Sequence, residues 1–327
     1  MGVFLDERRK QAAERIHALQ GELAKAQRLC GDKACVYITG SFARGEASPY
    51  SDLDLFIASG ANKSPKLTLL DEILVKADLI EATKKLGLPE FSGDGQYLTH
   101  HAVGELVDTL GKPEDDLNNT FTARLLLLLE SSPLVGKAAY EGATRDVIAA
   151  YWRDYEDHKN DFMPAFLAND ILRMWRTFCV NYEARTQSAP PQKRAKRRLK
   201  NYKLKHSRLL TCYSALLFML AVFVRNGTVS PADVEEMISL TPTQRLEWLI
   251  SRSDLATAAQ AEIRELITRY EGFLDKTEAS EAELVERFLD REKARAYFPS
   301  AQEFGNSVAK VMELIGDGSP FYRLLVV

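Results

Sequence analysis

The stretch TGSFARGEASPYSDLDLFI, residues 39–57, decides the fold of the N-terminal part of this chain. It continues the apolar run ACVYIT (34–39), which predicts a strand that ends in a strand-to-helix turn at Gly40-Ser41. After a loop, DLDLFIA (52–58) alternates acidic and apolar residues and predicts a second strand. Side chains two positions apart on a strand share a face, so we expect Asp52 and Asp54 to project side by side.

Two adjacent carboxylates need a physical reason, because they repel each other and raise each other's pKa unless cations lie between them. An isolated Asp-x-Asp pair is more often a solvated strand edge. Mg²⁺, however, binds one or two protein carboxylates together with substrate phosphates, and two such ions can activate an attacking oxygen and stabilise a leaving one. Together with the upstream turn, the pair Asp52 and Asp54 predicts a metal site.

The residues around the turn supply groups that can bind phosphate. Gly40 allows close approach of the backbone, and Ser41 offers a hydroxyl at an expected helix start, where free N–H groups favour anions. Arg44 can contact a phosphate or anchor the following loop. Ser51 can hydrogen-bond an aspartate or cap the turn. We therefore predict that Gly40, Ser41, Arg44 and Ser51 bind a nucleotide.

The combined pattern GSFARGEASPYSDLDLFI resembles the signature of the DNA polymerase β-like nucleotidyltransferase superfamily, in which Gly-Ser and a variable spacer precede Ser-Asp-x-Asp. The resemblance implies a small mixed sheet with helices and two catalytic Mg²⁺ ions, which Mn²⁺ can replace. It also implies transfer of a nucleoside monophosphate from a nucleoside triphosphate to an acceptor hydroxyl. On this basis Gly40 and Ser41 hold the triphosphate, while Asp52 and Asp54 hold the metals.

Superfamily members usually carry a third carboxylate on the strand that follows the next helix, which we expect at residues 66–86. The corresponding segment is LPEFSGDGQYLTHHAV (88–103), whose turn residues predict a hairpin. Asp94 is our preferred third catalytic acid and Glu90 the second choice, although a solvated turn aspartate is the ordinary interpretation of Asp94. Without a third acid, a catalytically inactive, antitoxin-like partner would be favoured.

The pattern changes after residue 115. From residue 120 onwards it predicts one helix after another and almost no strand. We therefore expect an α+β chain with a nucleotidyltransferase catalytic domain at 1–115 and a helical domain at 116–327 that closes the nucleotide and acceptor cleft. Residues 122–142 also resemble, more loosely, the segment after the catalytic domain in bacterial enzymes that nucleotidylylate signalling proteins.

The helical part contains a basic segment, KRAKRRLKNYKLKHSR (193–208), with nine Lys and Arg residues and no acid. A solvated basic face is the alternative to a phosphate-binding surface, which we favour because a phosphate site is already expected. Lys203, Lys205 and Arg208 would neutralise the triphosphate. Residues 193–198 could instead guide a single-stranded nucleic acid.

A second helix, at 166–185, carries a polar face on an otherwise apolar segment. Such a face needs partners, and either ion pairs inside the domain or the lining of the active-site cleft would supply them. The residues are Asn169, Asp170, Arg173, Arg176 and Thr177.

The last residues, GDGSPFYRLLVV, read as a packed strand or tail. Tyr322 could also supply a priming hydroxyl to the active site. Some oligonucleotide-making members of the superfamily in antiphage operons work from a protein primer, and the size and two-lobe plan of this chain are similar to theirs.

Composition is that of an ordinary globular protein, with 46% hydrophobic residues and a net charge of -3. The four cysteines form no CxxC pair, which favours reduced thiols and a cytoplasmic location. The apolar run at 209–224 is shorter than the roughly 20 residues that span a bilayer, so we expect a buried core helix and no stable membrane insertion.

These observations predict a nucleotidyltransferase that synthesises a nucleotide or an oligonucleotide without a template. The alternative is nucleotidylylation of a protein or RNA target, as in a toxin or a uridylyltransferase. Expected partners are a nucleoside triphosphate and a single-stranded nucleic acid or oligonucleotide product, with a protein acceptor or an operon partner as further options.

Overall fold

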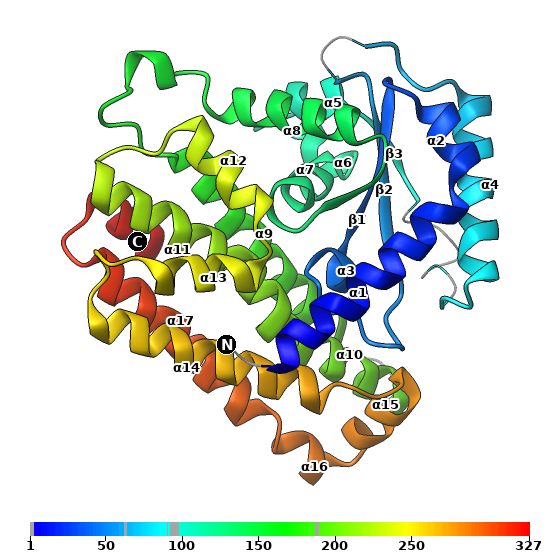
Figure 1. The fold of residues 1–327 in the computed structure, drawn as a ribbon. Coiled ribbons are helices and arrows are strands. Elements are labelled where there is room, and N and C mark those ends of the chain that lie inside the picture. The colour runs from blue at the N-terminus through cyan, green and yellow to red at the C-terminus, as the bar shows by residue number, and fades with distance from the viewer. Residues whose placement is uncertain (1–2, 62–63, 90, 92–97, 187–189) are drawn as a thin grey trace. The chain divides into compact units, whose positions relative to one another are not determined.

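The computed structural model describes residues 3–61, 64–89, 91, 98–186 and 190–327. The chain forms two compact units, Val3–Arg153 and Asp154–Val327, each described here by itself. The first unit extends well beyond the boundary expected at residue 115. The reason is that strand β4 (Ser132–Val135) returns to pair with β1 (Ala34–Thr39), so the segment after residue 115 belongs to the same sheet (Figure 1).

The first unit is built on a mixed sheet that, within the described residues, has four strands in the order β3-β2-β1-β4. The central strand β1 pairs antiparallel with β2 (Asp54–Ser59) and with β4, and all its residues are buried. β3 (His100–Ala102) pairs with β2 in parallel, so helix α4 (Leu69–Lys85) forms a crossover between the two. β3 accounts for residues 100–102 of the segment 88–103, and the turn of the hairpin expected there lies outside the described residues.

Helices cover both faces of the sheet. Helices α1 (Val3–Glu22), α2 (Ala24–Cys30) and α4 pack on one face, where Val36, Ile38, Leu55 and Ile57 enter the core. The alternate residues Tyr37 and Phe56 stack on the other face, with ring centroids 5.5 Å apart. That face is covered by α7 (Thr120–Leu129) and α8 (Lys137–Tyr151). The strand period of two therefore sorts the side chains between two layers of helix.

A chain of hydrogen bonds joins β2, β3 and α4 at the end of β2 away from Asp54. His100 Nε2 lies 2.7 Å from Ser59 Oγ, and its Nδ1 lies 2.8 Å from Glu72 Oε2. Ser59 Oγ also accepts a bond from the Leu67 amide, and Ser59 is only 1% exposed. The group fixes the crossover to the sheet, while His101 points to the aromatic face beside Phe56. The two histidines thus face opposite ways, as adjacent strand residues must.

The second unit is helical throughout its described residues, as the sequence predicts. The first unit also contains the short helices α5 (Val103–Asp108) and α6 (Glu114–Leu117), and the second unit begins with the 3₁₀ turn Tyr155–Asp157. The helices of the second unit are α9 (Ala165–Thr186), α10 (Pro191–Lys203), α11 (Leu209–Asn226), α12 (Pro231–Ser239), α13 (Pro242–Ser251), α14 (Thr257–Lys276), α15 (Glu281–Leu289), α16 (Arg291–Arg295), α17 (Phe298–Gly316) and α18 (Pro320–Val326). The C-terminal segment, expected as a strand or tail, is therefore a helix.

One long helix runs from Pro191 to Asn226 and combines α10, a π-helical turn at Leu204–Arg208, and α11. By length and composition it could cross a membrane, but 67% of its most apolar 18-residue window is buried inside the protein. Its apolar part packs against α9, α13 and α17 of the same unit. This agrees with the prediction of a core helix at 209–224.

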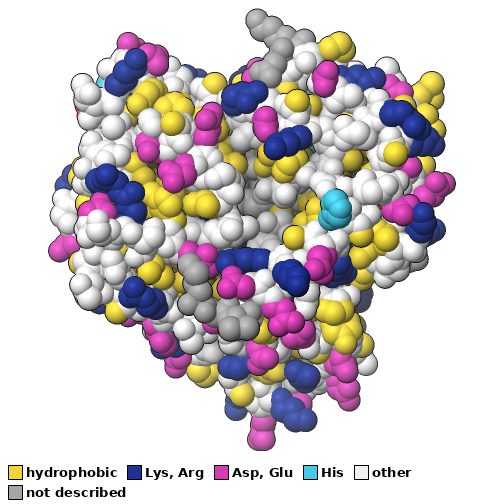
Figure 2. All heavy atoms as spheres, viewed as in Figure 1, with side chains coloured by type: hydrophobic (Ala, Val, Ile, Leu, Met, Phe, Trp, Pro, Cys, Tyr) yellow, Lys and Arg dark blue, Asp and Glu magenta, His cyan; other side chains and the backbone are white. Residues whose placement is uncertain are grey.

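Charged side chains of both signs are interspersed over the face of the molecule in Figure 2, as expected from a net charge of -3. All four cysteines are free thiols, and three of them are buried. This agrees with the prediction that the cysteines form no disulfide framework.

Candidate functional site

The turn after β1 lies directly against the first residue of β2. Gly40 has a φ of +70°, and a Cβ on it would lie 2.7 Å from Asp54 Oδ2. The contact follows from the register of the sheet, in which Thr39 is the partner of Asp54. Glycine is therefore needed at residue 40 for two reasons: the backbone there is left-handed, and the Asp54 carboxylate occupies the space that a side chain would take. The sequence motif thus brings its two halves together in space.

A buried ion network holds this turn from behind. Glu130 Oε1 accepts a hydrogen bond from the Gly40 amide at 3.2 Å, and Glu130 Oε2 accepts one from Arg44 Nη1 at 2.9 Å. Arg44 Nε donates to Glu46 Oε2 at 2.8 Å. Arg44, Glu46 and Glu130 are 7%, 3% and 3% exposed. The three charged groups therefore fasten the turn to the end of α7.

This network favours one of the two roles expected for Arg44. Its guanidinium is bound to two carboxylates inside the protein, so Arg44 anchors the loop, and its role in nucleotide binding stays a prediction. One of the amides at the helix start is not free, because the Gly40 N–H is bound to Glu130. The helix α3 (Gly40–Ala43) has only four residues, too few for an appreciable dipole.

Ser41 keeps the features expected of a phosphate-binding hydroxyl. Its side chain is half-buried, and within the described part of the chain its hydroxyl has no hydrogen-bond partner. Ser51, in contrast, caps the turn that precedes β2. Ser51 Oγ accepts a bond from the Ser48 amide at 2.9 Å, and Arg15 donates to the Ser48 carbonyl at 2.7 Å. Of the two roles expected for Ser51, the structure shows the capping role.

Asp52 and Asp54 differ more than the sequence suggests. The strand β2 begins at Asp54, which is half-buried, whereas Asp52 is exposed in the loop before it. The expected strand 52–58 is shorter at this end because β1 turns away at Gly40 and leaves Asp52 without a partner strand. The expectation that Asp52 and Asp54 share one face of a strand is therefore not met, because Asp52 lies in the loop before the strand.

The carboxylates of Asp52 and Asp54 are a donor set that suits Mg²⁺. Two carboxylates are compatible with Mg²⁺, which takes one or two of them and completes its shell with phosphate and water oxygens. Among the described residues, no group of three or more His, Cys, Asp or Glu side chains gathers to hold a metal. The two proposed third acids, Asp94 and Glu90, lie outside the described residues.

The other predicted residues belong to the second unit. Lys203 and Lys205 are exposed, at the end of α10 and in the π-helical turn. Arg208 lies over the Phe178 ring of α9, with its guanidinium carbon 5.6 Å from the ring centroid. Tyr322 is half-buried in α18, close to Gly316 at the end of α17. Tyr322 is therefore part of a packed helix.

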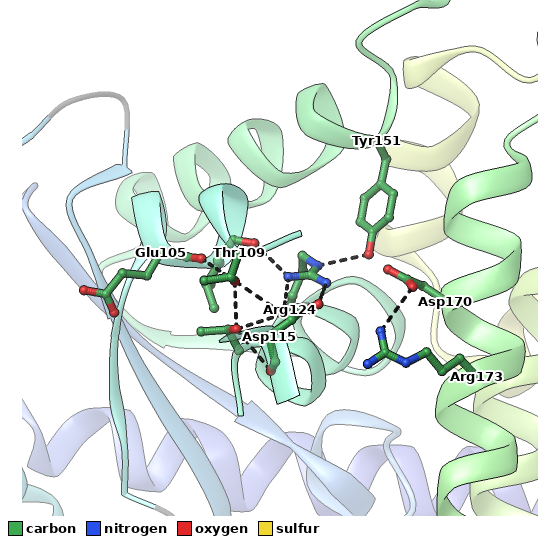
Figure 3. A network of polar contacts seen from close by, with 9 residues as sticks. Glu105, Thr109, Asp115, Arg124, Tyr151, Asp170 and Arg173 are labelled. Carbon is green, nitrogen blue, oxygen red and sulfur yellow. Dashed lines mark hydrogen bonds and ion pairs between the residues drawn. The ribbon is translucent and has the colours of Figure 1, made fainter. Parts of the chain in front are cut away.

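Two buried charged residues, one in α7 and one at its C-terminal end, were not found from the sequence. Glu130 follows five leucines, and Arg124 precedes them, so each stands at an apolar position where a charge needs a partner. Arg124 forms a fork to Asp115, with Nη1 and Nη2 each donating to a carboxylate oxygen, and also bonds the Leu106 carbonyl and the Tyr151 hydroxyl (Figure 3). Burial alone would lower the pKa of Arg124, but the bond to Asp115 raises it above its ordinary value.

Residues 22–89 match the nucleotidyltransferase domain family. The matched segment runs from the end of α1 to the residues after α4, and it contains the Gly40-Ser41 turn together with Asp52 and Asp54. The match supports a nucleotidyltransferase enzyme that transfers a nucleoside monophosphate and takes a nucleoside triphosphate as its substrate. A comparison with curated proteins gives no match.

Proposed function

We propose that the chain is a metal-dependent nucleotidyltransferase that makes a nucleotide or an oligonucleotide without a template. The monophosphate part of an NTP or dNTP would pass to an acceptor hydroxyl, and pyrophosphate would leave. The contact between Gly40 and Asp54 carries the proposal, because it joins a turn suited to phosphate with a carboxylate suited to a metal.

Asp52 and Asp54 are the proposed ligands of two Mg²⁺ ions, with Mn²⁺ as a substitute. When bound, the metal ions would neutralise the negative charge of the triphosphate and of the leaving pyrophosphate. Asp94 is the proposed third acid, and Glu90 is the second choice.

The protein itself contributes mainly positioning in this proposal. The Ser41 hydroxyl would donate a hydrogen bond to a phosphate oxygen, and the Glu130–Arg44 network would keep the turn in place while the substrate binds. Lys203 and Lys205 would neutralise phosphate charge, which their exposure supports. Phosphoryl transfer needs little covalent chemistry from a protein, so a pre-formed turn of this kind is a large part of catalysis.

Three further assignments rest on the resemblance to oligonucleotide-making members of the superfamily: a protein-primed reaction from Tyr322, a role in antiphage defence and a cytoplasmic location. A protein-primed reaction would use the hydroxyl of Tyr322, which is half-buried in α18.

The experiment that tests the proposal is incubation of the full chain with each α-labelled NTP and dNTP in Mg²⁺ or Mn²⁺. Free labelled oligomers or dinucleotides are the expected products. Asp54→Asn should abolish their formation, and Asp108→Asn, an exposed aspartate on α5, is the matched control.

If the label appears only on a protein band, the proposal of a free product is wrong, and nucleotidylylation of a protein or protein priming is favoured. Tyr322→Phe then separates the two, because it abolishes self-labelling only if Tyr322 is the primer. No labelled product from any nucleotide would favour the inactive, antitoxin-like partner.

A further inference from the structure

A groove runs along one side of helix α9 in the second unit. Its volume is about 320 Å³, at the lower end of the range for small-molecule sites. Every residue that lines the groove in the described chain belongs to α9: Asn169, Leu172, Arg173, Arg176, Thr177, Val180 and Asn181. The polar face that the sequence predicts on this helix therefore lines a cavity.

Two arginines of the groove stand one helical turn apart, Arg173 and Arg176, and so they can approach the same anion. Arg173 lies 3.9 Å from the carboxylate of Asp170, whose side chain is 7% exposed, an interaction visible in Figure 3. Arg176 is exposed and, among the described residues, forms no ion pair. The guanidinium group of Arg176 can therefore contact an anion in the groove.

The remaining residues suit a nucleotide better than a bare phosphate. Leu172 and Val180 provide an apolar surface, and Val180 is 65% exposed although it lies within the groove. Asn169, Thr177 and Asn181 add hydrogen-bonding groups around it, and Asn side chains can pair with the edge of a base. A phosphate would occupy the arginine pair, and a base or ribose would lie on the apolar surface.

We infer that the α9 groove binds a nucleotide of a single-stranded oligonucleotide acceptor, with its phosphate on Arg173 and Arg176. The inference rests on the proposed function, since it names the acceptor of that reaction. It favours a nucleic-acid acceptor over a protein one. The basic segment 193–208 can bind phosphate as well, so the α9 groove adds a second phosphate-binding surface to the one predicted there.

The inference is tested by binding of a short fluorescein-labelled oligoadenylate to the full chain, without divalent metal or NTP, across a series of salt concentrations. Arg176→Gln should weaken binding by about tenfold or more, as expected for a charge-assisted contact. It should also reduce the steepness of the plot of log affinity against log salt concentration by about one, as expected for the loss of one phosphate contact. Arg264→Gln, an exposed arginine on α14, is the control and should match the wild type.

Equal affinity and equal salt slope for wild type, Arg176→Gln and Arg264→Gln would overturn the inference, as would failure of the wild type to bind the probe. The proposed function is separated by measuring pyrophosphate release on the same proteins. If the chain binds the probe through Arg176 but releases no pyrophosphate, the groove inference holds and the proposed function fails. If the chain releases pyrophosphate but Arg176→Gln does not change probe binding, the proposed function holds and the groove inference fails.

Discussion

Gly40 and Asp54 are in direct contact, since any side chain on residue 40 would have to share space with Asp54 Oδ2, 2.7 Å from an added Cβ. The pairing of Thr39 with Asp54 fixes this contact from the backbone. A short sequence motif thus becomes a compact site in which the turn, the carboxylate and the Glu130 network depend on one another.

Replacement of Gly40 by alanine should lower nucleotide transfer far more than it lowers stability. Gly87 has a similar backbone, with φ of +61° against +70°, but nothing lies within 4 Å of an added Cβ. Both Gly→Ala variants should lose about 1–2 kcal/mol for the left-handed backbone. Only Gly40→Ala should also displace Asp54. Urea unfolding and kcat/KM measured on both proteins check this, and equal kcat/KM values would contradict the contact.

Removal of the Glu130 side chain should destabilise the first unit strongly. Glu130→Ala leaves the Gly40 amide without its acceptor and removes one of the carboxylates on Arg44, and breaking a buried pair costs about 3–5 kcal/mol. Glu22→Ala removes a pair with Lys85 that is largely exposed, and should cost less than about 1 kcal/mol. Urea unfolding measures both losses.

A separate result decides whether Glu130 positions the turn or only stabilises the unit. Glu130→Gln retains an acceptor for the Gly40 amide, so it should recover much of kcat even where its stability stays below that of the wild type. If Glu130→Gln and Glu130→Ala lose activity in proportion to their stability alone, Glu130 has no positioning role.

His206 should make stability fall in acid. It is buried in the second unit, stacks on Phe273 at 4.4 Å and bonds the Tyr202 carbonyl. Burial, with the charges of Lys276 and Lys205, lowers the pKa of His206 from 6.5 to about 4. Between about pH 6.5 and pH 4, His206 is therefore protonated in the unfolded chain but not in the folded chain. The free energy of unfolding is highest above about pH 6.5 and declines towards pH 4.

The expected loss over this pH range is roughly 3 kcal/mol. Urea unfolding at a series of pH values measures it, with His206→Asn as the comparison, because asparagine can bond the Tyr202 carbonyl but does not titrate. An unchanged pH dependence in His206→Asn would show that other groups control acid stability.

Arg124→Lys should destabilise the first unit although it keeps the charge. Lysine cannot reproduce the fork that joins Asp115 through both terminal nitrogens, nor the bond to the Tyr151 hydroxyl, so we expect a loss of about 2 kcal/mol or more in urea unfolding. Arg145→Lys, on α8, is the control and should be close to the wild type. A loss no greater than that of the control would show that the fork contributes little.

The sequence was sufficient where the signal is local. Strand 34–39, helix α4 and most of the helices after residue 136 follow from apolar periodicity and from glycine and proline at their ends, whereas α10 and α18 were not predicted. The Gly-Ser turn and the two aspartates are recognised from a single motif, and in the structure Gly40 lies against Asp54.

The remaining features depend on contacts between distant residues. Glu130 bonds a residue 90 positions earlier, and only the folded sheet makes that pairing visible. The strand β4 contains Pro133 and has four residues, so it resembles a loop between helices until its pairing with β1 is known. Asp52 leaves the strand because β1 turns away at Gly40, which no local pattern records.

The central claim, that Asp54 serves nucleotide transfer beside the Gly40 turn, is tested most directly by pyrophosphate release from NTP and Mg²⁺. The measurement compares wild type, Asp54→Asn and Asp108→Asn, all shown to be folded by urea unfolding. Loss of a partner that only orients a metal ligand costs 10–100-fold, so loss of a ligand itself should cost at least about 100-fold. Asp108→Asn should match the wild type. An Asp54→Asn protein that releases pyrophosphate at the wild-type rate would contradict the account.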